Sequence, residues 1–111
     1  MSYWTYLEID TGGPENEWPD VVEIGNMTSN VVGMWRAALN GVPLADFHHA
    51  PCSEAAGPLA DAVKRMEADP DTYRAMNPPN GWGNYEGALA YLRRLAEACA
   101  EHPKCRIRIS R

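Results

Sequence analysis

The stretch YEGALAYLRRLAEACAEHPKCRIRIS, residues 85–110, contains the two patterns that decide the fold. In its first part, apolar residues recur at helical spacing on one face, while charged residues such as Arg93 and Glu97 lie off that face. His102-Pro103 ends this pattern, and residues 104–111 then alternate between apolar and basic or polar side chains. The stretch therefore predicts a helix over 85–101, capped by Asn84, and a final strand with one buried face.

The rest of the chain surrounds this unit with further strands and helices. Residues 3–10 alternate and are rich in aromatic and β-branched side chains, so they predict a first strand, and a second short strand follows over 21–24. Apolar stripes and breaker residues predict further helices over 30–40, 54–68 and 70–76.

The expected order is ββαααβ when the short helix over 70–76 is counted with the helix before it. This order indicates an α+β fold with a small three-stranded antiparallel or mixed sheet and helices packed on one face. We expect the first strand in the centre of the sheet and the C-terminal strand beside it. At 111 residues, the chain is the size of a single domain spanning 1–111.

Charge and composition narrow the classes of partner. The net charge is −5, and residues 1–63 carry nine acidic residues and one basic residue. This acidity argues against nonspecific nucleic-acid binding. No apolar run approaches the roughly 18 residues that a membrane span needs, and Met1-Ser2-Tyr3-Trp4 does not resemble a signal peptide.

The cysteines point to a reducing compartment. Cys52, Cys99 and Cys105 are odd in number and form no C-x-x-C motif, so we expect reduced thiols and a cytoplasmic protein. A Cys99–Cys105 bridge across the turn from helix to strand is the alternative. The oligomeric state stays open.

Two polar segments that open helices are the first candidates for a binding site. In residues 25–30 the side chains of Asn26, Thr28, Ser29 and Asn30 crowd a helix start, where free N–H groups and the helix dipole favour anions. Helix capping alone explains the same residues. There is no G-x-G-x-x-G motif and no P-loop lysine, so the sequence predicts no cofactor.

The second segment is NPPNGWGNYE, residues 77–86. Two prolines stiffen it, Asn80-Gly81 is a turn signal, and Trp82 and Tyr85 follow at the start of a long helix. Trp82 could stack on a planar ligand, or it could instead fill the core between the helix and the sheet.

The leading hypothesis joins these two segments into one site, with Trp35 as a second stacking residue. It describes a small non-enzymatic binding module for a polar, anionic or nucleotide-like ligand. The same residues carry no catalytic set, and the acidic residues show no spacing that defines an acid–base pair. Asp46-Phe47-His48-His49 and Cys52 include zinc-ligand types, but adjacent histidines in a loop do not readily face one ion, so no metal site is predicted.

The acidic N-terminal half supports an alternative of a different class. Glu15, Glu17 and Asp20 surround Trp18, and an aromatic side chain ringed by acids suits a basic protein surface. In this alternative the protein is an inhibitor or adaptor that acts on a host protein.

Aromatic residues on the first strand and arginines on the last strand also alternate with other side chains. Arg106 and Arg108 face the same side of the expected sheet as Trp4 and Tyr6. Such a set can bind phosphates and stacked bases, or it can make ordinary cross-strand cation–π contacts. We favour the ordinary contacts.

Residues 23–111 resemble a group of short, uncharacterised proteins of actinobacteria, other bacteria and their phages. The likeness rests on Thr28-Ser29-Asn30 before a helix that carries Met34, on a P-x-N-G-W-G-x-Y segment at 78–85, and on Ala98-Cys99 before the last turn and strand. Members of the group carry histidine where this chain has Ser29. The resemblance implies a phage-type accessory protein that sequesters a small molecule or blocks a host protein, and it implies no reaction.

Overall fold

Three antiparallel strands form a single sheet in the computed structural model, which describes residues 2–111. The strands are β1 (Ser2–Ile9), β2 (Asp20–Thr28) and β3 (Cys105–Ser110), in the order β2-β1-β3. The N-terminal strand is therefore central, with the C-terminal strand beside it, as the sequence predicts. The α+β class is confirmed.

The helices occupy the segments expected for them. They are α1 (Val32–Ala38), α2 (Cys52–Ala68), α3 (Pro70–Arg74) and α4 (Tyr85–Glu101), and the order has four α-helices because the short α3 counts separately. Three short 3₁₀ helices, η1 (Glu15–Glu17), η2 (Ser29–Val31) and η3 (Leu44–Phe47), lie in the connections. The bounds of α4 agree with the prediction, and Asn84 caps it by accepting a hydrogen bond from the Gly87 N–H at 2.8 Å.

Strand β2 is longer than the sequence predicts. It continues through residues 25–28, for which the sequence predicts a turn before a helix. The pairing with β1 runs from Ser2 opposite Thr28 to Glu8 opposite Asp20, with irregularities after Thr5 and after Leu7. These cross-strand contacts outweigh the low strand propensity of Gly25-Asn26.

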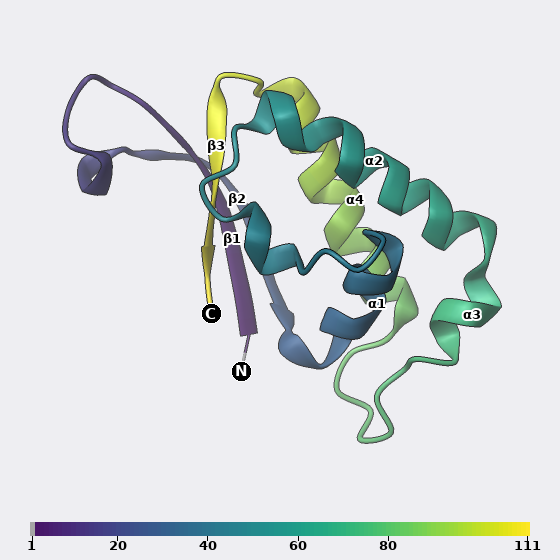
Figure 1. The fold of residues 1–111 in the computed structure, drawn as a ribbon. Helices are drawn as coiled ribbons and strands as arrows, with labels where there is room; N and C mark the ends of the chain where they lie inside the picture. The colour runs from purple at the N-terminus through teal and green to yellow at the C-terminus, as the bar shows by residue number, and fades with distance from the viewer. Residues whose placement is uncertain (1) are drawn as a thin grey trace.

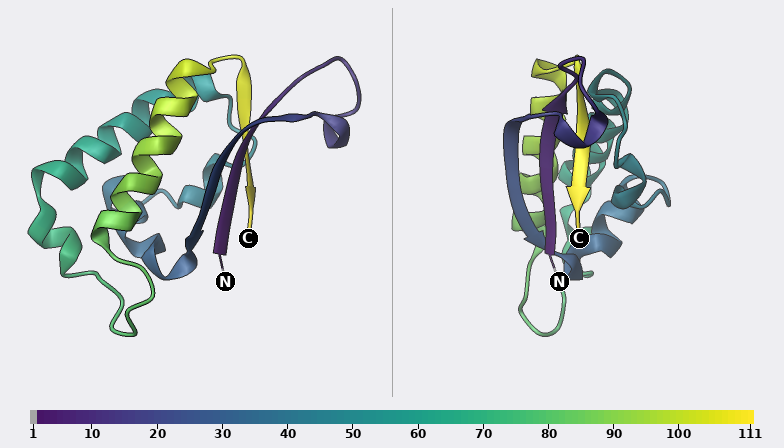
Figure 2. Two further views of the ribbon diagram at one scale, coloured as in Figure 1. Left: turned by 180° about the vertical axis from the view of Figure 1, so that it is seen from behind. Right: turned by 90° about the vertical axis from the view of Figure 1, so that its left-hand side faces the viewer.

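The helices cover one face of the sheet and leave the other uncovered (Figures 1 and 2). In the core, the Trp35 ring stacks on Tyr91 with a centroid separation of 5.4 Å and meets the edge of Tyr3 at 5.6 Å. The Trp35 Nε1–H donates to the Ala88 carbonyl, and the Tyr91 O–H donates to Thr5 Oγ1. The polar groups of these buried aromatics are thus satisfied inside the protein.

The connection between β1 and β2, residues 10–19, extends from the side of the sheet opposite the helices, as the views in Figures 1 and 2 agree. We call these residues the arm. Its Trp18 indole N–H donates to the Gly13 carbonyl at 3.2 Å, and a backbone bond from Ile9 N–H to the Pro19 carbonyl closes its base. The arm therefore has an internal fold of its own next to the uncovered face.

Candidate functional site

The structure brings together the two polar segments that the sequence singled out. Gly83 has a positive φ of +92°, and a Cβ added there would lie 2.6 Å from Thr28 Cγ2 and 2.8 Å from Val31 Cγ1. Only glycine allows so close an approach in this conformation. The loop that carries Trp82 thus rests directly on the end of β2 and on η2.

Side-chain oxygens accept hydrogen bonds from three backbone N–H groups at this junction. Asn77 Oδ1 accepts from the Tyr85 N–H at 2.8 Å, and Asn80 Oδ1 accepts from the Trp82 N–H at 3.0 Å. Thr28 Oγ1 accepts from the Asn30 N–H at 3.4 Å. These bonds are the helix-capping and turn interactions that were the alternative to an anion site. They hold the loop in one shape.

The three aromatic residues of the leading hypothesis lie in different environments. Trp35 is fully buried, and Tyr85 is buried with its O–H donating to the Met66 carbonyl at 2.7 Å. Trp82 is 69% exposed. Asn26 and Asn30 are exposed as well. Stacking on a ligand at this junction is therefore left to Trp82. Five cavities lie on the surface of the described residues, and no residue of the hypothesis lines any of them.

The uncovered face of the sheet carries a network of opposite charges. Glu8 is 3% exposed, and its carboxylate accepts a hydrogen bond from Arg106 Nε at 2.6 Å and lies 3.5 Å from Arg108 Nε. Arg106 also pairs with Glu15 at 3.3 Å, and Arg108 pairs with Asp20 at 2.6 Å. Both guanidinium groups therefore already have carboxylate partners from elsewhere in the chain.

The same arginines cover two aromatic rings. The Arg106 guanidinium carbon lies 3.9 Å from the centre of the Trp18 ring, and that of Arg108 lies 4.2 Å from the Tyr6 ring. Arg108 stands opposite Tyr6 in the pairing of β3 with β1. These are the ordinary cation–π contacts that we expect from the sequence in preference to a phosphate platform.

A polar cavity of about 510 Å³ lies between the arm and this network, and it is the largest of the five. Its volume is within the usual range of ligand pockets. Three carboxylates and two guanidinium groups line it, so acids are in excess. The lining includes Glu8, Glu15, Trp18, Asp20, Arg106 and Arg108.

Of the four residues predicted as a partner surface, three line this cavity. Glu15, Trp18 and Asp20 line it, and Glu17 does not. Sequence reasoning missed that Glu8 and His49 belong to the same place. The strand alternation, which puts Glu8 on the face of Trp4 and Tyr6, was the available signal for Glu8. Nothing in the sequence pattern could place His49 there.

His49 reaches the cavity because residues 48–50 pair with the outer edge of β3. The His49 N–H donates to the Ile107 carbonyl, and the Ile107 N–H donates to the Ala50 carbonyl. His48 Nδ1 accepts from the Ile109 N–H at 2.9 Å, and the two imidazoles stack at 3.8 Å. This segment thus covers the free edge of β3.

The pKa of His48 is lowered from its ordinary value of 6.5. Much of the side chain is exposed, but its Nδ1 edge lies against β3, and the resulting loss of hydration is the main cause. His49, Arg106 and Arg108 lower the pKa further, and the Glu8 carboxylate opposes them. The lowered pKa and the hydrogen bond that Nδ1 accepts from the backbone both favour the neutral form of His48.

The three thiols are free and buried, so the structure contains no Cys99–Cys105 bridge. Cys99 and Cys52 share a hydrogen bond, and this bond together with burial raises the pKa of the Cys99 thiol. Burial raises the pKa of Cys105 as well. Among residues 2–111, no group of three or more histidine, cysteine or acidic side chains is placed to hold a metal ion.

No family model, no curated protein and no solved structure matches this chain. The resemblance to actinobacterial and phage proteins stays a prediction. Within the described part of the chain, every helix is too short or too polar to cross a membrane.

Proposed function

We propose that the protein is a non-enzymatic binding module that recognises a positively charged segment of a partner protein. The observation that carries the proposal is the 510 Å³ cavity between the arm and the uncovered face of the sheet, in which carboxylates outnumber guanidinium groups. The resemblance stated above suggests that the partner is a host protein.

Charge favours a cationic partner over a phosphate. Arg106 and Arg108 would have to give up Glu8, Glu15 and Asp20 to bind an anion, and Glu8 is too buried to move into solvent cheaply. Glu15 is different, because its side chain is 69% exposed at the rim. A lysine or arginine of the partner can share the Glu15 carboxylate without leaving a buried charge unpaired.

Trp18 gives the cavity a rigid aromatic wall. The Arg106 guanidinium packs over its ring, and its indole N–H donates a hydrogen bond to the Gly13 carbonyl. These two contacts fix the position of the ring. Partner-binding hot spots are enriched in such fixed aromatic residues, because little side-chain entropy is lost on binding. An arginine of the partner can add a second cation–π contact there.

The test is a titration with short peptides of opposite charge. We expect hexa-arginine to bind, with an affinity that falls as salt is raised, and hexa-glutamate not to bind. Glu15→Gln should weaken hexa-arginine binding about twofold to fivefold, as expected for the loss of one exposed charge pair. Tryptophan fluorescence and isothermal titration calorimetry measure both effects.

Asp71→Asn is the matched control, because the Asp71 side chain is 98% exposed on α3 and does not line the cavity. Equal losses in Glu15→Gln and Asp71→Asn would mean that the peptide responds only to overall charge. That result, or equal binding of the acidic peptide, would contradict the proposal.

A second candidate function concerns the loop of Trp82, and the observation that favours it is the 69% exposure of that ring on a loop with fixed geometry. In this function a small planar, polar or nucleotide-like ligand stacks on Trp82. Melting temperatures across a panel of nucleotides and other anions test it, with Trp82→Ala as the comparison. A response that is flat across the panel would remove this candidate.

A further inference from the structure

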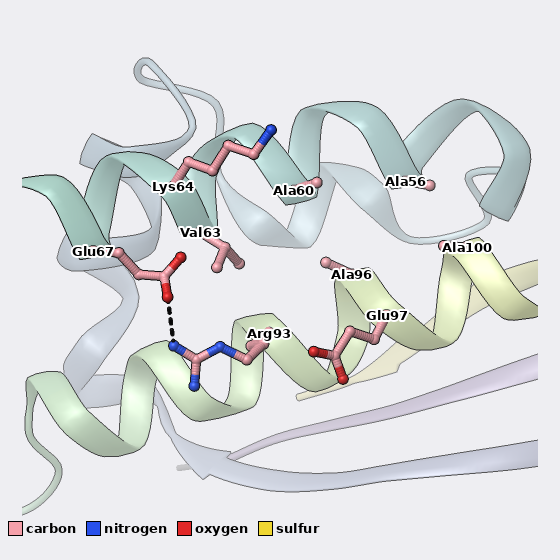
Figure 3. A pocket seen from close by; sticks show the side chains of 9 residues that line it. All are labelled: Ala56, Ala60, Val63, Lys64, Glu67, Arg93, Ala96, Glu97 and Ala100. Carbon is pink, nitrogen blue, oxygen red and sulfur yellow. Dashed lines mark hydrogen bonds and ion pairs between the residues drawn. The ribbon is translucent and has the colours of Figure 1, made fainter.

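A second hollow, unrelated to the arm, lies between α2 and α4 (Figure 3). Its volume is about 300 Å³. Small apolar side chains form its floor, and they leave the two helix backbones accessible to another helix. These residues are Ala56, Ala60, Val63, Ala96 and Ala100. We call this hollow the α2/α4 groove.

Four charged side chains border the groove, and their charges sum to zero. Glu67 of α2 pairs with Arg93 of α4 at 2.9 Å and closes one end. That leaves Lys64 on the wall formed by α2 and Glu97 on the wall formed by α4. Neither has an ion pair with any residue in 2–111. Each wall therefore keeps one unmatched charge, and the two are of opposite sign.

These two charges lie at nearly the same level along the groove. Figure 3 shows that α2 and α4 run antiparallel, with Glu67 facing Arg93 at one end and Ala56 near Ala100 at the other. Lys64 precedes Glu67 by three residues, and Glu97 follows Arg93 by four. At a rise of about 1.5 Å per residue, Lys64 and Glu97 lie about 4.5 Å and about 6 Å from the ion pair, both on the same side.

We propose that the α2/α4 groove is the contact surface of a homodimer, with a second copy of this chain as its occupant. A two-fold axis along the groove places the α2 wall of one copy over the α4 wall of the other. Lys64 of each copy then faces Glu97 of its partner, and the positions of the two residues along the groove differ by only about 1.5 Å. The alanine floor lets the four helices approach closely.

Charge makes a second copy fit this surface better than a charged partner does. The whole chain has a net charge of −5, which opposes self-association elsewhere on the surface. The groove is locally neutral, and its charges are complementary to those of a second groove. The electrostatic repulsion between two copies is therefore smallest at this surface. A basic segment gains nothing from a neutral groove, and the acidic arm lies on the other side of the sheet (Figure 2).

The expected dimer is weak. Both helices have 17 residues and are therefore about 25 Å long, so two of them offer a modest area. A standard interface buries about 800 Å² on each partner, about an eighth of the 6022 Å² surface of this chain. We expect a dissociation constant on the order of 100 µM, as for small transient interfaces.

Sedimentation equilibrium of the full chain and of two charge reversals tests the proposal. Lys64→Glu alone and Glu97→Lys alone each turn two attractive pairs of the dimer into two repulsive ones. Each variant alone should associate about tenfold more weakly than the wild type, or more weakly still. Circular dichroism and melting temperature of each variant check that both remain folded, as expected because both side chains are exposed.

An equimolar mixture of the two variants gives the decisive result. In a dimer formed from one chain of each kind, every reversed charge meets its opposite, so association should return to the level of the wild type. Lys104→Glu and Asp61→Lys, which lie outside the groove, provide a control mixture. These controls should associate like the wild type both singly and mixed.

Three results would overturn the proposal. The wild type could remain monomeric up to about 1 mM, tenfold above the expected constant. The two reversals could leave association unchanged, or their mixture could stay as monomeric as each variant alone. Binding of an unrelated amphipathic helix to a monomeric wild type would assign the groove to a different partner and would also overturn it. The arm and its cavity play no part in any of these outcomes.

Discussion

Replacing Gly83 with alanine should destabilise the protein much more than the same change at Gly81. Both glycines flank Trp82 and both have a positive φ, of +76° at Gly81 and +92° at Gly83. A side chain in this conformation costs about 1 kcal/mol at either position. The two positions differ in the room available for a side chain, because a Cβ added at Gly81 would have no atom within 4 Å.

At Gly83 the added methyl group would overlap Thr28 Cγ2 and Val31 Cγ1. Both neighbours are β-branched and stiff, and Val31 is fully buried, so neither can yield cheaply. Overpacking of this kind costs about 1–3 kcal/mol more. We therefore expect losses of about 1 kcal/mol for Gly81→Ala and about 2–4 kcal/mol for Gly83→Ala.

Urea unfolding followed by circular dichroism measures both losses as changes in the free energy of unfolding. For a domain of this size, about 1 kcal/mol corresponds to about 4 °C in melting temperature, so the expected shifts are about 4 °C and about 8–16 °C. The slope of the urea dependence should not change. Equal losses at the two positions would refute the reasoning, because they would mean that the loop does not rest on β2 and η2.

The His48 side chain and the three buried thiols give two further predictions. Because the folded-state pKa of His48 is lowered, the unfolded chain binds more protons, so stability should fall as pH drops below about 6.5. The melting temperature should therefore decrease less between about pH 8 and pH 5 in His48→Gln than in the wild type. Cys52, Cys99 and Cys105 are buried, so Ellman's reagent should react with all of them only after denaturation. Fast labelling of the native protein would contradict the packing described here.

Local sequence patterns were sufficient for the elements whose signals are short-range. The helix over 85–101 was predicted with its bounds because an apolar stripe, the Asn84 cap and the His102-Pro103 stop all act within a few residues. Alternation likewise predicted β1 and β3 and the face that each buries. The clustering of acidic residues around Trp18 is also a local feature of the sequence, and their role as a partner surface stays a prediction.

Long-range contacts decided the rest. Strand β2 extends to Thr28 only because β1 pairs with it, and Trp35 is buried only because α4 and the sheet enclose it. Long-range contacts also form the cavity at the arm, because its Glu8–Arg106 pair joins residues 98 positions apart. Periodicity shows which face of an element is polar, but it does not show which polar side chains meet across that face. Their meeting is fixed by strand register and by the fold of the arm, which depend on the packing of the whole chain.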